Sequence, residues 1–289
     1  MNIVVIGTKG RLGAALAREY ARDLELSGFD RNHVDLRNLD QVQSMFSEME
    51  FDLLLNCAAL TNVDYCESNP DEAFLVNAEA PRLLAEICQR KSARLVHFST
   101  DYVFDGKQHA PYTEEDIPAP LSVYGRSKLE GERRVLNISS NNLVVRLSWV
   151  FGPDKPSFID QVIDRGREQD TVAAVGDKFS SPTYAIDVAD WLRLAWEKQG
   201  HGILHLANNG GCSWWEWAQY ALVTCRSAGI PLKTDHVEVL TLADMKNFVA
   251  KRPVHTVLST AKFAALTGVQ PRHWRDALAA YIREYVTKT

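Results

Sequence analysis

Short apolar runs alternate with amphipathic segments along the first 150 residues of this chain, and one further helix and strand are predicted within 185–207. The apolar runs have the length of buried strands and lie at 3–7, 24–29, 52–56, 94–99, 142–147 and 203–207. Segments with apolar residues at helical spacing lie at about 11–22, 38–49, 71–90, 122–137 and 185–198. Short, largely apolar strands that alternate with helices are typical of a parallel sheet covered on both faces. The pattern predicts an α/β fold with a doubly wound parallel sheet.

The alternation of strands and helices breaks down after residue 150. Residues 151–184 and 211–289 carry turn signals such as Gly152-Pro153 and several tryptophans, and the sixth strand and its helix interrupt them. We therefore expect two domains: 1–150 with 185–210 returning to it, and a smaller lobe made from 151–184 and 211–289 that closes over a substrate. Trp214, Trp215 and Trp217 are interpreted as packing residues of that lobe rather than as a surface for stacking bases.

Three glycines follow the first predicted strand at Gly7, Gly10 and Gly13, and an amphipathic helix follows them. Residues without side chains let the backbone approach a pyrophosphate closely, and the helix N-terminus offers unpaired N–H groups to the anion. The strand, the glycine turn and the helix together predict a dinucleotide-binding domain of Rossmann type in residues 1–150.

Asp30 and Arg31 directly follow the second predicted strand, and Asp30 is 17 residues beyond Gly13. A carboxylate there would accept hydrogen bonds from the adenine-ribose hydroxyls and repel a 2′-phosphate, which favours NADH. A guanidinium beside it would pair with that phosphate, which favours NADPH. Both cofactors stay open at this point, as does a simple turn role for the two residues.

Tyr124 and Lys128 are four residues apart in a predicted helix, so they lie on one face, one turn apart. A tyrosine normally titrates near pH ~10, which is high for a proton-transfer group at neutral pH. An ammonium at ~4 Å would favour the phenolate by about 4 kcal/mol at an effective dielectric of ~20, or roughly 3 pKa units. The pair therefore suits proton transfer to or from a carbonyl oxygen.

The composition is that of an ordinary globular protein. The 289 residues are 46% hydrophobic and 24% charged, and the formal net charge is −5. This charge argues against binding to nucleic acid or to an anionic membrane. No apolar stretch approaches the ~18 residues of a membrane span. The first strand begins too early to leave room for a secretory leader, so we expect a cytoplasmic protein.

No metal site is predicted from the sequence. The five cysteines show no Cys-x-x-Cys pair and are interpreted as reduced thiols. His201 and His205 are four apart, but they flank a turn that enters a strand, where that spacing does not converge on one ion. The acidic run 114–116 is interpreted as a solvated loop.

Several segments together resemble one family, the dTDP-4-dehydrorhamnose reductases of the extended short-chain dehydrogenase/reductase superfamily. The glycine turn and the pair Tyr124 and Lys128 are shared widely in that superfamily. The more specific segments are 56–64 (NCAALTNVD), 99–106 (STDYVFDG), 146–152 (RLSWVFG), 181–183 (SPT), 202–206 (GILHL), 213–214 (SW) and 251–253 (KRP). The resemblance spans nearly the whole chain.

The resemblance implies a role for each matching residue. Thr100 corresponds to the catalytic hydroxyl, Tyr124 to the proton donor, and Lys128 to the residue that lowers the tyrosine pKa and holds the nicotinamide ribose. With Tyr124 and Lys128, the implied cofactor-binding residues are Gly7, Gly10, Arg11, Leu12, Gly13, Asp30, Asp35, Leu36, Asn56, Ala58, Ala59, Leu60 and Phe98. With Thr100, the implied substrate-binding residues are Thr61, Val63, Asp101, Tyr102 and Trp149.

The implied function is NADPH- or NADH-dependent reduction of the 4-keto group of a nucleotide-linked deoxysugar. A dehydratase or epimerase on the same scaffold is a second hypothesis, although Tyr102 stands where a 4,6-dehydratase places an acid after Thr-Asp. The third is a non-catalytic, NADP-binding regulatory subunit of the methionine adenosyltransferase type. The nucleotide, the C4 stereochemistry, a homodimer and a metal that assists assembly are left open.

Overall fold

A six-stranded parallel sheet forms the centre of the computed structural model, which describes residues 1–288. The strand order is β10-β5-β4-β3-β1-β2, and every neighbouring pair is parallel. The strands are β1 (Asn2–Ile6), β2 (Glu25–Phe29), β3 (Leu53–Asn56), β4 (Arg94–Thr100), β5 (Leu143–Leu147) and β10 (Gly202–His205). The predicted doubly wound α/β fold is confirmed, and each predicted strand is present with ends shifted by a residue or two.

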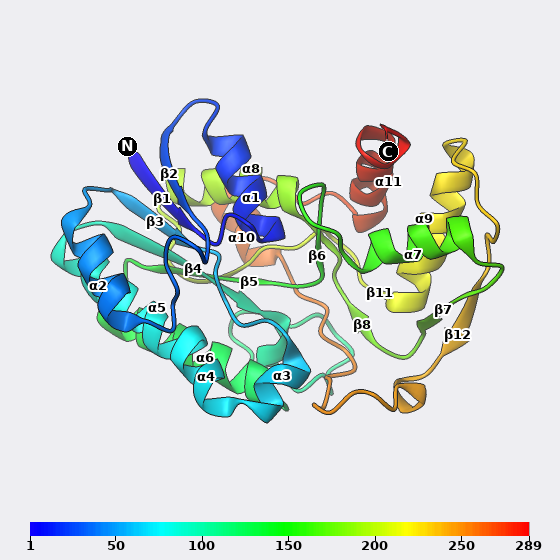
Figure 1. Cartoon of the computed structure of the whole chain (residues 1–289), viewed down its shortest axis with the longest axis horizontal. Coiled ribbons are helices and arrows are strands. Elements are labelled where there is room, and N and C mark those ends of the chain that lie inside the picture. The colour runs from blue at the N-terminus through cyan, green and yellow to red at the C-terminus, as the bar shows by residue number, and fades with distance from the viewer. Residues whose placement is uncertain (289) are drawn as a thin grey trace.

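Helices cover both faces of this sheet (Figure 1). One face carries α1 (Arg11–Tyr20), α8 (Ala185–Glu197) and α10 (Ala261–Thr267), and the other carries α2 (Leu39–Glu48), α5 (Ala80–Arg90) and α6 (Val123–Ile138). Because successive strand side chains point to opposite faces, Ile3 and Val5 enter the first core, and Val4 and Ile6 enter the second. Within residues 1–288, no helix is long and apolar enough to cross a membrane.

The helix predicted over 71–90 is interrupted by one turn of π-helix. The chain forms α3 (Val63–Ser68), α4 (Pro70–Phe74), the π turn Leu75–Glu79 and then α5. The π turn carries the buried Asn77, whose side chain accepts a hydrogen bond from the Leu60 N–H and donates to the Leu60 carbonyl. This irregular turn therefore fixes the loop that follows β3, at the edge of the sheet where ligands bind.

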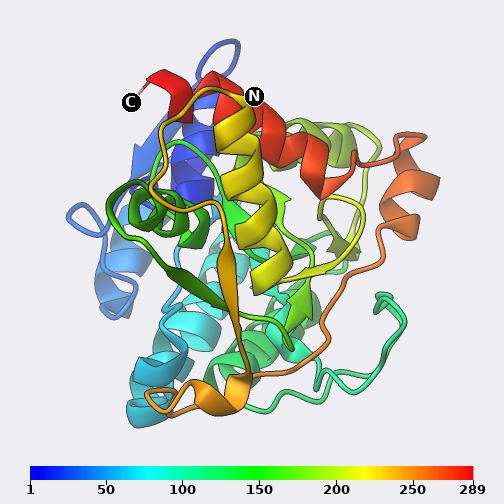
Figure 2. The ribbon, with the colours of Figure 1, turned by 90° about the vertical axis from the view of Figure 1, so that its right-hand side faces the viewer.

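A smaller lobe packs beside the sheet domain and is built around three helices, α7 (Phe158–Glu168), α9 (Trp214–Ser227) and α11 (Trp274–Glu284) (Figure 2). The short strands are β6 (Val150–Phe151), β7 (Val172–Val175), β8 (Phe179–Ser180), β9 (Thr183–Tyr184), β11 (Cys212–Ser213) and β12 (Val237–Leu240). They pair as β12 with β7, β11 with β8, and β6 with β9. Trp217 and Trp274 are buried in this lobe, so their role there is packing.

The domain boundaries drawn from the sequence remain a prediction. The helix α10 lies within the range 211–289 that was assigned to the smaller lobe, yet it contacts α8 and β10. Its Phe263 is buried in the same core as Ile3 and Val5. The last part of the chain therefore returns to the sheet before α11 completes the smaller lobe.

Candidate active site

A cleft of about 570 Å³ opens at the carboxyl ends of β1, β3, β4 and β5, where ligands bind in open α/β sheets. It brings together the predicted site residues that lie far apart in the sequence. Its lining includes Gly7, Gly10, Arg11, Leu12, Asp30, Asp35, Leu36, Ala58, Ala59, Leu60, Thr61, Val63, Phe98, Thr100, Asp101, Tyr102, Tyr124, Lys128 and Trp149. Gly13 and Asn56 are not part of this lining and lie behind it.

The glycine turn has the shape that a pyrophosphate requires. Gly7 has a φ of +93°, and a Cβ there would lie 2.8 Å from the Ala58 nitrogen. A Cβ on Gly13 would lie 2.2 Å from the Gly7 oxygen, so Gly13 lets α1 pack against the turn. Gly10 caps α1 without any side chain, and the first turn holds no acidic residue. The N–H groups of this helix end are thus free of side-chain caps, and the turn fits a dinucleotide.

Arg11 joins the glycine-turn end of the cleft to the loop 154–156. Its Nε donates to the Lys155 carbonyl at 3.2 Å, and its Nη2 donates to the Pro156 carbonyl at 2.8 Å. Two turns further along α1, Arg18 pairs with Asp154. These contacts hold the loop 154–156 against the first helix, beside the glycine turn.

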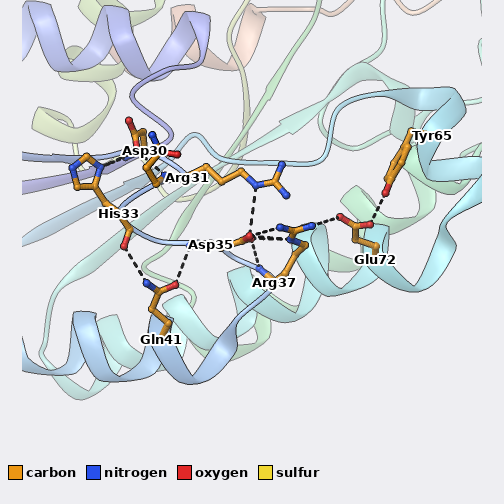
Figure 3. A network of polar contacts seen from close by, with 9 residues as sticks. Asp30, Arg31, His33, Asp35, Arg37, Gln41, Tyr65 and Glu72 are labelled. Carbon is orange, nitrogen blue, oxygen red and sulfur yellow. Dashed lines mark hydrogen bonds and ion pairs between the residues drawn. The ribbon is translucent and has the colours of Figure 1, made fainter.

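Asp30 is paired with neighbouring side chains rather than left free, and its contact with His33 is shown in Figure 3. Its carboxylate lies 2.6 Å from Lys9 Nζ and 2.8 Å from His33 Nδ1, and it accepts a hydrogen bond of 2.7 Å from the Asn32 N–H. The hydrogen bond from Lys9 is the largest cause that lowers the pKa of Asp30 well below its usual range. The negative charge that would repel a 2′-phosphate is therefore offset by Lys9.

Two arginines share the next carboxylate along the same loop (Figure 3). Arg37 Nη2 lies 2.5 Å from Asp35, and Arg31 Nε lies 3.6 Å from it. Hydrogen bonding from Arg37 lowers the pKa of Asp35 to about 2. The Glu72 carboxylate pairs with Arg37 at 3.5 Å and accepts a hydrogen bond from the Tyr65 hydroxyl at 2.7 Å. Lys9, Arg31 and Arg37 all line the cleft, and the sequence analysis gave no role to Lys9 or Arg37.

The start of α6 places Tyr124 beside the end of β4. Ser122 caps this helix by accepting a hydrogen bond from the Gly125 N–H at 3.2 Å. A Cβ on Gly125 would lie 2.3 Å from the Tyr102 carbonyl oxygen, so only glycine lets the helix approach so closely. The rings of Tyr102 and Tyr124 then meet edge to face, with centroids 5.7 Å apart.

Lys128 is buried beneath the same strand. Its Nζ donates to the Phe98 carbonyl at 2.7 Å and lies 3.3 Å from His97 Nε2. Burial lowers the pKa of Lys128 to about 8, and the nearby carboxylate of Glu132 opposes that effect. The amine therefore gains and loses its proton near neutral pH, which suits a group that exchanges protons.

The expected fall in the Tyr124 pKa is wrong for this structure. Burial raises the pKa of Tyr124, and a hydrogen bond with the Thr100 side chain only partly opposes the rise. The Lys128 amine is bonded to the Phe98 carbonyl, and desolvation of the phenol outweighs any effect of its charge. Tyr124 thus stays protonated at neutral pH, the form that a proton donor needs.

Asp101 connects the end of β4 to the smaller lobe. One carboxylate oxygen accepts from the Thr100 hydroxyl at 3.2 Å. The other accepts from the Ser180 hydroxyl at 2.9 Å and from the Thr256 hydroxyl at 2.5 Å. The carboxylate, expected to face a sugar, is bonded to three protein hydroxyls and fixes the orientation of Thr100.

A second carboxylate, Asp64 at the start of α3, holds the segment 249–252. Its carboxylate accepts hydrogen bonds from the backbone N–H groups of Val249 and Ala250, each at 2.9 Å. It also pairs with both terminal nitrogens of Arg252, at 2.9 and 2.6 Å. Arg252 lowers the pKa of Asp64 to about 2. The sequence showed both residues in family-like segments and gave neither a role.

Trp149 lines the cleft and combines an unusual backbone conformation with an unpaired indole nitrogen. Its φ of +40° is unusual for a residue with a side chain. Its ring packs 5.6 Å from both Trp214 and Trp217. Its buried Nε1–H has no hydrogen-bond partner in the described part of the chain. Backbone strain and an unpaired donor at a cleft are typical of a residue that meets a ligand.

Comparisons with known proteins agree along the whole chain. The family model described as RmlD substrate binding domain matches residues 1–287. The dTDP-4-dehydrorhamnose reductase of Aggregatibacter actinomycetemcomitans is 32% identical over 96% of this chain and 97% of its own. A solved dTDP-4-dehydrorhamnose reductase from Clostridium acetobutylicum superimposes with a TM-score of 0.91 at 32% identity, covering 100% of both chains. A Bacillus anthracis dTDP-4-dehydrorhamnose reductase, solved in complex with NADP, gives 0.90 at 30% identity, covering 98% of this chain and 99% of its own.

Proposed function

Because the chain belongs to the dTDP-4-dehydrorhamnose reductase family of NAD(P)H-dependent oxidoreductases, we propose that it reduces the 4-keto group of dTDP-4-dehydro-6-deoxy-L-mannose to give dTDP-L-rhamnose. The observation that carries this proposal is the meeting of Thr100, Tyr124 and Lys128 in one cleft beside the glycine turn. A hydroxyl, a protonated phenol and an amine that titrates near neutral pH are the groups needed to convert a ketone to an alcohol.

In the proposed reaction the protein positions the ketone and supplies the proton. A bound nicotinamide cofactor supplies the hydride. Tyr124 donates its proton to the oxygen of the former ketone, and its raised pKa keeps that proton available. Lys128, with a pKa of about 8, returns a proton to the site after each turnover.

The orientation of Thr100 is fixed by its neighbours. Its hydroxyl oxygen accepts from the Tyr102 N–H at 3.1 Å while its proton goes to Asp101. This leaves the hydroxyl oxygen beside Tyr124, and a hydrogen bond between the two side chains lowers the Tyr124 pKa in part. We propose that Thr100 holds the phenol in place while the sugar oxygen takes the proton.

The dehydratase hypothesis is disfavoured by the residues that follow Thr100. Elimination of water needs an acid there that can lose its proton, but burial raises the pKa of Tyr102 far above its usual range. The carboxylate of Asp101 is already bonded to three hydroxyls. A non-catalytic regulatory subunit would not require Thr100, Tyr124 and Lys128 to share a cleft, so reduction is the better account.

The proposal is tested by incubating the protein with dTDP-4-dehydro-6-deoxy-L-mannose and either NADPH or NADH. The nicotinamide absorbance should fall in step with the sugar consumed, and dTDP-L-rhamnose should form. Sugar loss without cofactor oxidation, or no reaction with either cofactor, would overturn the proposal.

A further inference from the structure

Lys178 is a fully buried lysine that no step of the proposed reaction uses. It directly precedes β8, and its exposed fraction is 0%. Its Nζ donates to the Pro253 carbonyl at 2.7 Å. A lysine is almost never fully buried unless it is paired, because the ammonium loses its hydration. The position of Lys178 therefore needs an explanation.

Aromatic rings supply the missing interactions. The Lys178 ammonium lies 4.9 Å from the centroid of the Tyr102 ring. It lies 5.9 Å from the ring of Trp149 and 5.9 Å from that of Trp214. All three distances are within the range of a cation–π contact, which strengthens when water is excluded.

Two of these three rings also face the ligand. Tyr102 and Trp149 line the cleft, and Lys178 lies behind them, outside the lining. The rings come from different parts of the fold, since Tyr102 follows β4 and Trp149 lies between β5 and β6. The buried Lys178 ammonium thus contacts the rings of Tyr102 and Trp149, which belong to different backbone elements.

We propose that Lys178 is a positioning residue for the sugar side of the cleft: its ammonium holds the Tyr102 and Trp149 rings in the orientation that contacts the nucleotide sugar. This inference rests on the proposed function and names a determinant of substrate affinity. Lys178 lies outside the lining of the cleft, so its loss should weaken sugar binding and leave cofactor binding intact.

The charge of Lys178 gives the proposal a pH signature. Burial lowers the pKa of Lys178 to about 8, Asp101 opposes the shift, and Arg252 adds to it. His255 is the other titratable group that senses this ammonium. Below pH ~8 the ammonium is charged and attracts the rings, and above that pH the attraction weakens. The KM for the sugar should therefore rise above about pH 8.

The test is Lys178→Met, which keeps the length of the side chain and removes its charge. We expect the KM for the nucleotide sugar to rise about tenfold, the range of a desolvated cation–π contact, while the Kd for NADPH changes less than about twofold. The variant leaves the Pro253 carbonyl without its donor, so the melting temperature should fall slightly; the unchanged Kd for NADPH shows that the fold of the cofactor side is kept.

Lys262→Met is the matched control. Lys262 Nζ also donates to a backbone carbonyl, that of Ile203 at 2.8 Å, but on α10, away from the cleft. The sugar KM and the NADPH Kd of Lys262→Met should equal those of the unmodified protein. Tryptophan fluorescence should show a transition near pH 8 in the unmodified protein and in Lys262→Met, and none in Lys178→Met.

The possible outcomes separate this inference from the proposed function. An unchanged sugar KM in Lys178→Met overturns the inference and leaves the reductase assignment intact. A parallel loss of sugar affinity, cofactor affinity and melting temperature also overturns it, because that pattern marks a purely structural residue. No turnover by the unmodified protein overturns both.

Discussion

The two ends of the cleft are built in different ways. The end that we assign to the cofactor comes mainly from short stretches of the first sixty residues, where the backbone itself makes the site through the Gly7 turn and the uncapped start of α1. The substrate end is assembled from segments far apart in the chain, which buried side chains such as Asp101 and Lys178 connect. Changes at the first end should alter one ligand's affinity. Changes at the second should also alter how the two lobes are joined.

Tyr124→Phe acts where the two ends meet and should have the largest effect. It removes the proton donor and keeps the ring, so kcat should fall by ~10²–10⁴-fold while the NADPH Kd stays nearly constant. Steady-state kinetics and a binding titration measure the two quantities. A variant that keeps more than about a tenth of the original kcat would show that Tyr124 is not the donor.

Lys128→Met should have the next largest effect and would also reveal the role of the amine's pKa. A neutral side chain cannot return a proton, so we expect kcat to fall by roughly 10²-fold. In the unmodified protein kcat, measured at saturating sugar so that changes in KM do not enter, should fall as pH rises through about 8, where Lys128 loses its proton. That alkaline limb should be absent from the variant, and a limb that persists near pH 8 would assign it to another group.

Arg31→Gln tests the cofactor end alone. Lys9 offsets the charge of Asp30, and Arg31 is 66% exposed with a single ion pair at 3.6 Å, so it is free to meet a 2′-phosphate. We expect NADPH to be preferred, and the variant to lose about 1.5–3 kcal/mol of that preference, measured as the ratio of kcat/KM for the two cofactors. Arg22→Gln, at a similarly exposed arginine paired with Glu19, is the control. A preference for NADH in the unmodified protein would mean that Asp30 decides the choice.

Asp64→Asn tests the substrate end and should have the smallest effect. It weakens the pairing with Arg252 that holds the segment 249–252, so the free energy of unfolding should fall by about 1–2 kcal/mol and the sugar KM should rise a few-fold. Asp23→Asn, in the exposed pair with Arg193, should lower the free energy of unfolding by less than Asp64→Asn does. An equal loss in both variants would mean that the Asp64 pairing is no more than a surface contact.

The same variant has a pH signature. The folded pKa of Asp64, about 2, is below its ordinary value of 3.8. Its contribution to stability is therefore present above about pH 4 and is lost as pH falls through 2. The difference in unfolding free energy between the unmodified protein and Asp64→Asn should shrink as pH falls from about 4 to 2 and be constant above pH 4. Denaturant titrations at several pH values measure it.

The two ends also differ in how well the sequence predicts them. Gly7, Gly10 and Gly13, and the four-residue spacing of Tyr124 and Lys128, express local backbone geometry, so their placement can be read from spacing. Lys178, Ser180 and Thr256 meet Tyr102 and Asp101 only through the folding of the smaller lobe. No spacing in the sequence indicates such contacts.

Two errors have the same physical origin. The π turn at 75–79 interrupts a segment whose apolar spacing is that of an ordinary helix. It depends on hydrogen bonds between the Asn77 side chain and the Leu60 backbone, which the spacing does not indicate. The rise in the Tyr124 pKa depends on burial, which the spacing to Lys128 does not report. Desolvation or tertiary packing decides the helix type at 75–79 and the Tyr124 pKa, so the local residue pattern cannot predict them.

The most direct test of the central claim follows the hydride itself. The protein is given dTDP-4-dehydro-6-deoxy-L-mannose and NADPH that carries deuterium at both hydrogen positions of C4 of the nicotinamide, and the sugar product is examined by NMR and mass spectrometry. Our account predicts one deuterium at C4 of the sugar for each NADPH oxidised. Deuterium at another carbon, or conversion of the sugar with no net oxidation of the cofactor, would contradict it.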